Sequence, residues 1–391
     1  MTGPLSGVTV LDLSRVMAGP WAGQILADLG ARVVKVERPG IGDETRSWGP
    51  PYLATEDDGR PGASAYFLSV NRGKRSVEID LSTASGQEDV RRLARESDIL
   101  LENFRPGTLA RFGLGYPELS RENPRLIYCS ITGFGQSGPR RSNVAYDFMI
   151  QAMSGLMSVT GPPDDSPGGG PQKVGVPVVD IMTGMYAAVG VLAALERQRR
   201  TGHGDYIDLA MLDVATGMLA NQAMNYLVGE REPKRHGNKH PNIQPQDVYR
   251  CADGHLVLAV GNDEQFRRLC DALGMAELAG ADSFRTNADR VRNLPELDEI
   301  LAREFATKPL AHWLEELARR DVPCGPINTI PMAFEEAQLR HRGMIRTLRR
   351  DNGADVPQVV SPLRFEQAPL TFRVPPPELG EHTEEVLGEL R

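Results

Sequence analysis

The sequence predicts an α/β fold with a second, smaller α+β domain. Up to about residue 227, short apolar runs rich in β-branched residues alternate with helical patterns, which is typical of a sheet built from βαβ units. A polar, turn-rich stretch over 229–245 then precedes a hairpin pattern and several helices. β-rich segments return near the carboxyl end. We therefore expect a large domain over 1–227, a small domain over 228–328, and a return to the large domain over 329–391.

The first elements form one βαβ unit. The runs Val8–Leu13 and Arg32–Glu37 are apolar and β-rich, and the helical pattern Ala22–Leu29 between them ends at Gly30. Two strands joined by a short helix are normally parallel, with a right-handed connection. Ligands of open α/β sheets collect at the carboxyl ends of such strands.

Further elements follow from the same patterns. The sequence predicts the following strands and helices: strands at Ser76–Leu81, Ile99–Glu102, Arg125–Ile131, Tyr206–Leu212 and Val356–Val360, a hairpin turning at Asp253-Gly254, and helices at Gly86–Glu96, Tyr146–Val159, Val214–Leu227 (capped by Asp213), Glu264–Leu273, Leu294–Phe305 and Pro309–Arg320.

Polar and basic residues recur where the predicted strands end or begin. Such clusters in an acidic protein can meet the phosphates of a ligand, although arginines and lysines more often form a solvated surface. The residues concerned are Met17, Ala18 and Arg38, then Arg72, Lys74 and Arg75, and then Asn103, Arg105 and Arg111.

The sequence G-F-G-Q-S-G over 133–138 matches the dinucleotide-binding pattern but not its context. Pro139 follows the last glycine, and no helix begins there to receive a pyrophosphate. A tight loop is the better interpretation, and a nicotinamide or flavin oxidoreductase is disfavoured.

The stretch Val174–Arg200 stands out because Asp180 directly precedes a long apolar run with helical spacing. One interpretation is that Asp180 is the N-cap of a core helix. The other is that the helix terminus keeps this carboxylate ionised as a nucleophile, with backbone N–H groups at the start of the helix as oxyanion donors. The two interpretations are compatible.

Composition excludes several classes of protein. The 391 residues carry a formal net charge of −8, so no general basic surface for nucleic acid is expected. The four cysteines show no C-x-x-C spacing, and no metal site is expected. The amino-terminal residues show no signal sequence, and no apolar run was expected to span a membrane. A cytoplasmic location fits these observations.

The ordered motifs resemble those of the family III CoA-transferases over nearly the whole chain. They are V-L-D-L-S-R-V-M-A-G-P, V-V-K-V-E-R-P-G-I-G-D-E-T-R, N-R-G-K-R-S-V-E-I-D-L, E-N-F-R-P-G, V-V-D-I-M-T-G-M, P-C-G-P-I-N and G-E-H-T-E-E-V-L. The resemblance implies a Rossmann-like large domain built from both chain ends, an inserted small domain, and an intertwined homodimer of interlocked rings. It implies CoA or acyl-CoA as substrate, with no permanently bound cofactor.

The resemblance also assigns residues. It places the nucleophile at Asp180, and the CoA contacts at Met17, Ala18, Arg38, Ile79, Ser82, Asn103, Phe104, Arg105, Arg111 and Tyr146. Ser82 stands where formyl-CoA transferase has a lysine. The small domain lacks that enzyme's glycine-rich run and reads G-N-K-H-P-N-I-Q-P, which disfavours a formyl-CoA or oxalate specificity. The sequences H-P-N-I and A-V-G-N-D-E-Q-F resemble those of members that act on dicarboxylates such as glutarate, citramalate or succinate.

Two alternatives share this pattern. An α-methylacyl-CoA racemase has the same fold, but its acid–base histidine is replaced here by Tyr146, beside Asp147. A tyrosine with a pKa near about 10 is a poor base at neutral pH. A non-catalytic acyl-CoA binder would need no carboxylate at position 180.

None of the seven histidines is assigned to catalysis; His240 is a candidate for the acyl pocket.

Overall fold

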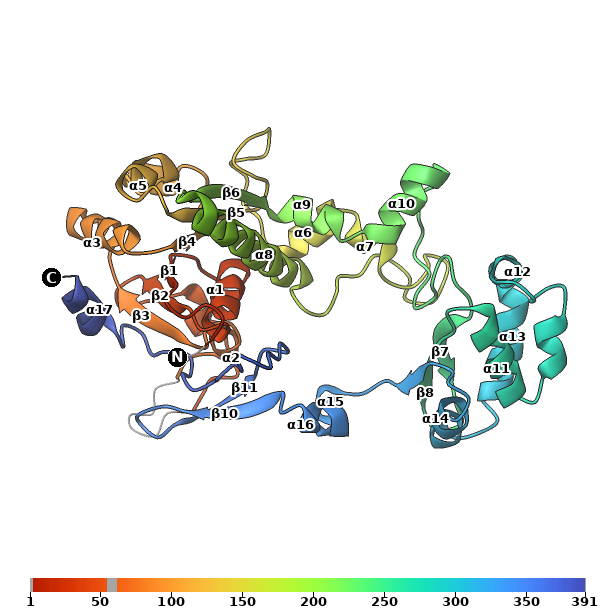
Figure 1. Ribbon diagram of the computed structural model, residues 1–391. Coiled ribbons are helices and arrows are strands. Elements are labelled where there is room, and N and C mark those ends of the chain that lie inside the picture. Colours follow the sequence, from red (N-terminus) through yellow and green to blue (C-terminus); the bar gives the residue numbers. More distant parts are fainter. Residues whose placement is uncertain (1–2, 55–61, 391) are drawn as a thin grey trace. The chain divides into compact units, whose positions relative to one another are not determined.

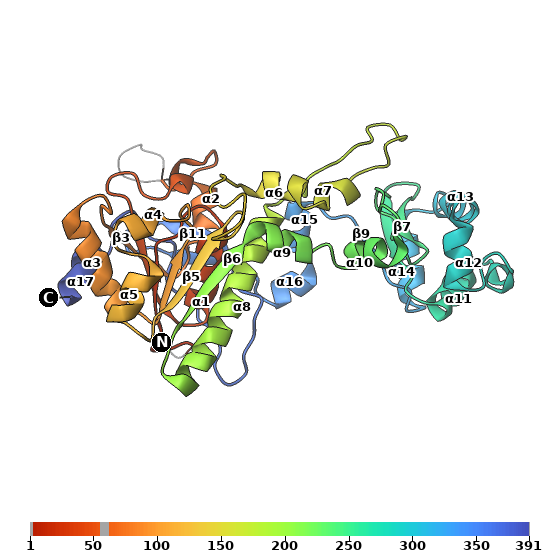
Figure 2. The ribbon, with the colours of Figure 1, turned by 90° about the horizontal axis from the view of Figure 1, so that it is seen from above.

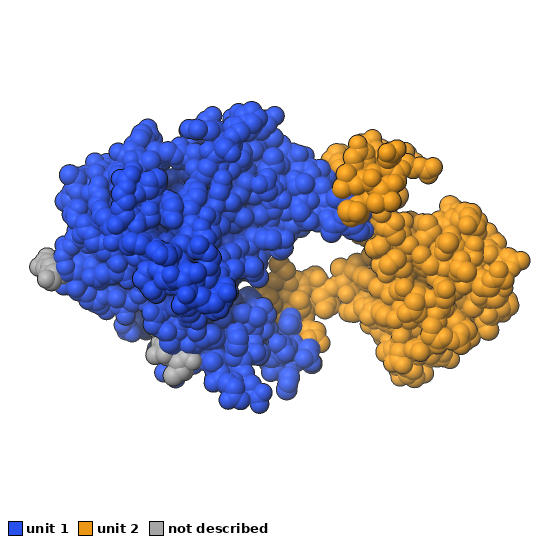
Figure 3. Space-filling view, turned by 45° about the horizontal axis from the view of Figure 1, so that its top comes forward, with its two compact units in different colours: residues 1–156, 174–223, 337–391 blue, residues 157–173, 224–336 orange. Residues whose placement is uncertain are grey.

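A computed structural model describes residues 3–54 and 62–390. The chain divides into two compact units, coloured separately in Figure 3. Unit 1 comprises Met1–Leu156, Val174–Ala223 and Ala337–Arg391, and unit 2 comprises Met157–Lys173 and Met224–Glu336. The predicted small domain, 228–328, lies inside the longer segment of unit 2. The short segment 157–173 was not expected to join it.

Unit 1 contains a six-stranded parallel sheet with the order β3-β2-β1-β4-β5-β6 (Figure 1). The α/β class is therefore confirmed. Chain order reverses between β1 and β4, where ligands of doubly wound sheets bind. The strands are β1 (Thr9–Asp12), β2 (Arg32–Glu37), β3 (Lys74–Glu78), β4 (Ile99–Glu102), β5 (Ile127–Thr132) and β6 (Asp205–Ala210).

Helices cover both faces of this sheet, as parallel strands require. One face packs against α1 (Ala18–Asp28) and α8 (Val178–Thr201), with Val10, Ile99 and Ile127 in the shared core (Figure 2). The opposite face packs against further helices around Leu11 and Leu100. Those helices are α3 (Ala84–Arg95), α4 (Thr108–Arg111), α5 (Tyr116–Glu122) and α17 (Thr383–Glu389).

Two predicted helices are each interrupted. The predicted helix Tyr146–Val159 is two helices, α6 (Asp147–Met153) and α7 (Leu156–Val159), separated at Gly155, where φ is +92°. The predicted helix Val214–Leu227 begins earlier, as α9 (Met211–Gly217), and resumes as α10 (Ala220–Gly229). Asp213 therefore lies in the first turn of α9, whose N-cap is Ala210, and is not the cap.

Helix α8 corrects the expectation that no apolar run is long enough to span a membrane. Among the described residues it is the one helix whose length and apolar composition would suffice to span a membrane, although the sequence was expected to contain no such run. Core helices of soluble proteins pass the same test. Here α8 packs along α1, β5 and β6, with Ala187 and Val191 fully buried.

Unit 2 has an antiparallel sheet of β7 (Gln246–Arg250), β8 (His255–Ala259) and β9 (Cys324–Pro326). The predicted hairpin is confirmed as β7–β8. Helices pack against this sheet around Phe266, Phe305 and Trp313. They are α11 (Asp263–Ala272), η2 (Ala276–Gly280), α12 (Asn287–Arg292), α13 (Leu294–Phe305) and α14 (Leu310–Ala318).

The carboxyl-terminal segment supplies further elements of unit 1. Helix α17 lies against β3: the backbone N–H of His382 donates to the carbonyl of Ser76 at 2.9 Å, and that of Glu78 donates to Oγ1 of Thr383 at 3.0 Å. The remaining elements of unit 1 are η1 (Glu44–Ser47), α2 (Ala65–Leu68), α16 (Ala337–His341) and the antiparallel pair β10 (Ile345–Arg349) and β11 (Asp355–Val359). Helix α15 (Ile330–Glu335) belongs to unit 2.

Candidate active site

A cavity of about 270 Å³ lies at the carboxyl ends of β1 and β4, where the strand order reverses. Asp180 is part of its wall. The turn after β1 and the segment after β4 form other parts of the same wall. Six of the predicted CoA-contact residues line this cavity together with Asp180: Met17, Ala18, Asn103, Phe104, Arg105 and Tyr146.

A second cavity, of about 320 Å³, shares Arg15, Glu44 and Phe104 with the first, so the two adjoin. Its wall includes three more of the predicted residues, Arg38, Ile79 and Ser82. The sheet topology thus brings together side chains that are far apart in sequence. Arg111 is different: it is exposed at the end of α4 and lines neither cavity.

Asp180 lies in the first turn of α8 but is not its cap. The N-cap position is Pro177, and the carboxylate that caps the helix belongs to Asp147. Oδ2 of Asp147 accepts hydrogen bonds from the backbone N–H groups of Val179 at 2.8 Å and Asp180 at 3.2 Å. The predicted capping role of Asp180 is therefore wrong.

The environment of Asp180 also differs from the expectation that the helix terminus keeps it ionised. Burial, and then the negative charge of Asp147, raise the pKa of Asp180 to about 7. A carboxylate with this pKa is a better nucleophile than an ordinary aspartate, because basicity and nucleophilicity rise together, but only part of it is ionised at neutral pH.

The first backbone N–H groups of α8 cannot serve as the predicted oxyanion donors in this conformation. Those of Val179 and Asp180 are bonded to Asp147, and that of Ile181 donates to the carbonyl of Pro177 at 3.0 Å. A carbonyl oxygen that becomes negatively charged near Asp180 must find its donors elsewhere.

The turn after β1 is fixed from two sides. The side-chain amide of Asn103 accepts from the backbone N–H of Arg15 at 2.8 Å and donates to its carbonyl at 2.6 Å. The guanidinium of Arg15 lies 4.9 Å from the ring centroid of Phe104. Because both polar atoms of the Asn103 amide are engaged in this way, its principal role in the structure is to hold the turn.

Comparison with known proteins identifies the family. The family model described as CoA-transferase family III matches residues 5–383. The chain belongs to CoA-transferase family III. The enzyme prediction is therefore confirmed at the level of the family.

The chain is similar to named CoA-transferases and to a solved structure. The chain is 48% identical over 387 residues to a succinate–glutarate CoA-transferase of Agrobacterium fabrum, covering 99% of this chain and 96% of that protein. It is 42% identical to the succinyl-CoA:glutarate CoA-transferase of Mus musculus, covering 99% and 86%. A crystal structure of a CAIB/BAIF family protein from Brucella suis aligns over the whole of both chains with a TM-score of 0.87 and 45% identity.

One predicted phosphate cluster of this family III protein is not part of the site. Arg72 forms a buried ion pair with Asp28 at 2.6 Å, and Lys74 forms one with Asp12 at 2.8 Å. Arg75 pairs with Glu385 of α17. These three cations hold the sheet and the carboxyl-terminal segment together and do not line either cavity. Arg72 and Lys74 are buried and fit neither the phosphate interpretation nor the solvated one, whereas Arg75 is partly exposed in a surface ion pair.

Sequence reasoning missed three residues in or around the candidate site, of which Asp43 lines the second cavity. Asp147 was noted only as a neighbour of Tyr146, and Asp43 was not noted at all. Tyr66 lies beside Trp48 with ring centroids 5.2 Å apart, and Trp48 lines the cavity. Burial, and then the charges of Asp180 and Asp147, raise the pKa of Tyr66 to about 12. Tyr66 lies in the short helix α2 (Ala65–Leu68), and a tyrosine in such an apolar run carries no sequence signal for this position.

The loop 133–138 of the transferase is a turn, as predicted. Gly135 has a φ of +86°, and its N–H donates to Oγ1 of Thr132 at 2.8 Å. No helix begins until α6, at Asp147. Among residues 3–54 and 62–390, no group of three His, Cys, Asp or Glu side chains is arranged to hold a metal ion.

Proposed function

We propose that this protein transfers CoA between small dicarboxylic acids of the succinate and glutarate class, with Asp180 as the nucleophile. The observation that carries the proposal is the position of Asp180: a partly buried carboxylate in a cavity at the strand-order reversal, lined by most of the residues expected to contact CoA. The names of the relatives support the choice of acids.

The proposed chemistry is a double displacement. A carboxylate oxygen of Asp180 attacks the thioester carbonyl of the donor, the C–S bond breaks, and an acyl–aspartyl anhydride and CoA thiolate form. The thiolate then attacks the aspartyl carbonyl, which releases the donor acid and leaves an aspartyl–CoA thioester. The acceptor carboxylate attacks the aspartyl carbonyl of this thioester, which releases CoA thiolate and forms a second anhydride. The thiolate then attacks the acceptor acyl carbonyl of that anhydride, which gives the acceptor acyl-CoA and frees the Asp180 carboxylate. Atoms and charges balance without a redox group or a metal.

Positive charge beside Asp180 suits such substrates. Arg105 and Arg141 both line the cavity of Asp180. A dicarboxylate keeps one carboxylate while the other carries CoA, and CoA itself carries phosphates, so arginines with several donors are suitable partners for either.

We also propose a homodimer, in which a second copy covers exposed apolar side chains. Met185, Tyr186 and Val189 on α8 are 41%, 49% and 59% exposed. Leu227 and Val228 of α10 are 67% and 78% exposed. Such apolar surface favours association. Light scattering after size exclusion tests this: wild-type protein is expected to be dimeric, and Val189→Glu to be more dissociated. A monomeric wild type contradicts it.

The function is tested with Asp180→Ala. We expect succinyl-CoA to donate CoA to glutarate with the wild type, and turnover to fall by a factor of about 10³ or more in the variant. CoA binding, measured by calorimetry, should persist. Turnover at the wild-type rate contradicts the role of Asp180. Deuterium exchange at the acyl α-carbon would instead indicate a racemase, and binding without turnover in the wild type would indicate a carrier.

The covalent route has its own test. If the acceptor carboxylate forms an anhydride with Asp180, one of its oxygen atoms remains on the Asp180 carboxylate after the thiolate departs with the acyl group. Acceptor acid labelled with heavy oxygen should therefore label the peptide containing Asp180 during turnover, by mass spectrometry. If the acceptor acyl-CoA forms while the peptide containing Asp180 stays unlabelled, the anhydride intermediate is contradicted.

A further inference from the structure

The turn between β1 and α1 contains a backbone conformation that its sequence does not favour. Val16 has a φ of +69°, in the left-handed region, where β-branched residues are rarely found. Glycine would adopt this conformation without steric cost. This valine lines the cavity of Asp180, between Arg15 and Met17. Something outside the turn must therefore stabilise it.

Asp43 supplies that stabilisation. The backbone N–H of Val16 points at its carboxylate, with distances of 3.3 Å to Oδ1 and 3.2 Å to Oδ2. The preceding residue is held independently by the amide of Asn103. Asp43 comes from the loop after β2 and Asn103 from the segment after β4, so the turn is held by the segments that follow the two strands flanking β1.

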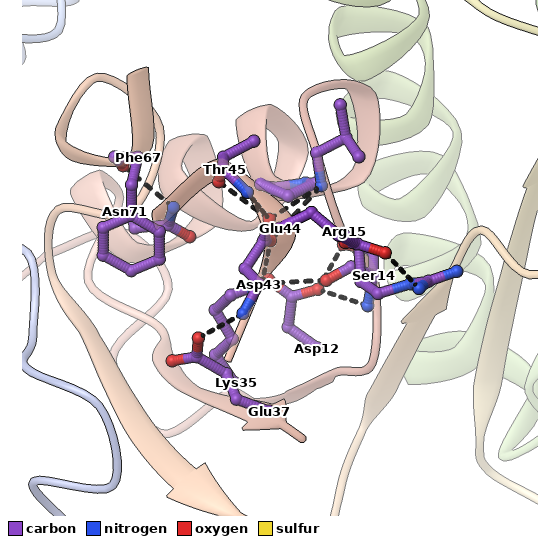
Figure 4. Close-up of polar contacts among 12 residues, drawn as sticks. Asp12, Ser14, Arg15, Lys35, Glu37, Asp43, Glu44, Thr45, Phe67 and Asn71 are labelled. Atoms are coloured by element: carbon purple, nitrogen blue, oxygen red, sulfur yellow. Dashed lines mark hydrogen bonds and ion pairs between the residues drawn. The ribbon is translucent and has the colours of Figure 1, made fainter. Parts of the chain in front are cut away.

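Asp43 is itself fixed by a buried network, drawn in Figure 4. Its carboxylate lies 3.0 Å from Nζ of Lys35 and accepts from the backbone N–H of Thr45 at 3.0 Å and from its hydroxyl at 2.7 Å. The backbone N–H of Asp43 donates to Glu37 at 2.9 Å. Lys35 also donates to the carbonyl of Ser14 at 2.8 Å. The Lys35 and Asp43 side chains are fully buried.

The network therefore lies directly behind the active-site turn. Lys35 and Asp43 hold Ser14 and Val16, the residues on either side of Arg15. The next residues, Met17 and Ala18, line the cavity of Asp180 and lie at the start of α1. A displaced turn would move this wall relative to Asp180, and displacements of about 1 Å can cost large factors in rate.

We propose that Asp43 is a positioning residue, which holds Val16 in the left-handed conformation so that Met17 and Ala18 lie correctly for the thioester that Asp180 attacks. The inference rests on the proposed function. It makes a specific claim: the contribution of Asp43 to turnover acts through the backbone conformation of Val16, and glycine at position 16 should make Asp43 dispensable for it.

A double-mutant cycle tests this claim. Asp43→Asn is expected to lower kcat on the order of tenfold when residue 16 is valine, and by less than about threefold in the Val16→Gly background. KM for the acyl-CoA is expected to change less than kcat. The stability lost with the Lys35 ion pair should persist in both backgrounds, because glycine does not replace that pair. An equal loss of kcat in both backgrounds, or no loss in either, overturns the proposal.

Two further variants keep the test decisive. Asp28→Asn removes another buried aspartate of unit 1, the partner of Arg72, outside both cavities. It should lower stability without lowering kcat, and Val16→Gly should not alter its effect. If Asp43→Asn does not fold, Asp43→Ser, which also removes the carboxylate that faces the Val16 N–H, enters the same cycle with the same expectation. A wild type that transfers no CoA would refute the proposed function instead.

Discussion

The carboxylate of Asp147 bonds the backbone N–H of Asp180 at 3.2 Å, so one aspartate caps the helix that carries the other. Oδ1 of Asp147 accepts from Nε2 of Gln151 at 2.5 Å, and Gln151 accepts from the N–H of Val174 in the segment before α8. The capping group is thus held by α6. It fixes the start of α8 while placing a negative charge close to the proposed nucleophile.

Asp147→Asn should separate these two effects. Asparagine keeps an oxygen that can accept from the helix N–H groups, but it removes the charge that helps to raise the pKa of Asp180. We expect the acidic limb of the kcat/KM profile to move to lower pH, with little change in unfolding temperature. Asp147→Ala, which removes the cap, should cost about 1 kcal/mol of stability. If the acidic limb of the kcat/KM profile stays at the same pH in Asp147→Asn, the charge of Asp147 does not raise the pKa of Asp180 as proposed.

The wild-type pH profile follows from the pKa of about 7 at Asp180. The nucleophile must be ionised, so kcat/KM should rise about tenfold per pH unit below that value and level off above it. A surface aspartate would give a limb near pH 4. Initial rates of thioester exchange between pH 5 and pH 9, in buffers of constant ionic strength, distinguish the two.

Asp180→Asn should be more stable than the wild type at alkaline pH. Because the folded-state pKa of Asp180 lies above the ordinary aspartate value of 3.8, the folded protein binds more protons than the unfolded chain between these values. The free energy of unfolding therefore decreases as pH rises towards 7. Above pH 7 the ionised Asp180 carboxylate destabilises the folded protein. We expect the variant to unfold a few degrees higher at pH 8, with the difference shrinking towards pH 4. An equal or larger difference at pH 4 would contradict this explanation.

Gly184 permits the close packing of α8 on α1. An added Cβ would lie 2.6 Å from the carbonyl oxygen of Ala18 and 2.9 Å from Cβ of Trp21. Gly184→Ala should therefore destabilise the protein by about 1–3 kcal/mol and lower kcat, because Asp180 is one turn away. The matched control is Gly190→Ala in the same helix, where the nearest atom, of Ile207, would be 3.6 Å away. That change should be neutral or stabilise by up to about 1 kcal/mol. Equal denaturation midpoints for the two variants would refute the packing argument.

Local patterns predicted most of the strands and the position of the site. The run Ile99–Glu102 has the predicted bounds, and the carboxyl ends of the strands do form the cavities. What failed depended on partners distant in sequence. The cap of α8 is Asp147, which is far from the helix in the sequence, so the nearer Asp180 received that role. Lys74 and Arg72 have the local appearance of surface cations, because nothing near them reveals their buried partners Asp12 and Asp28.

The network behind the turn was not predictable for a related reason. Asp43 stands in a polar, glycine-containing loop, where an aspartate is normally solvated. Its burial requires Lys35 on β2 and the turn at Val16 to meet it, which only the folded sheet provides. The resemblance of the chain to a family supplied site residues but not this second layer.

The bonds between β3 and the last residues of the chain bear on how the protein is made. Ser76 and Glu78 receive partners from Gly380, His382 and Thr383. A ribosome therefore adds about 300 residues after β3 before residues 380–383 can bond to this edge of the sheet. The sheet of unit 2 comes from one continuous stretch, 246–326, so it can be finished earlier. Until residues 380–383 have been added, the nascent chain exposes an open strand, and this is the interval in which a chaperone would matter most.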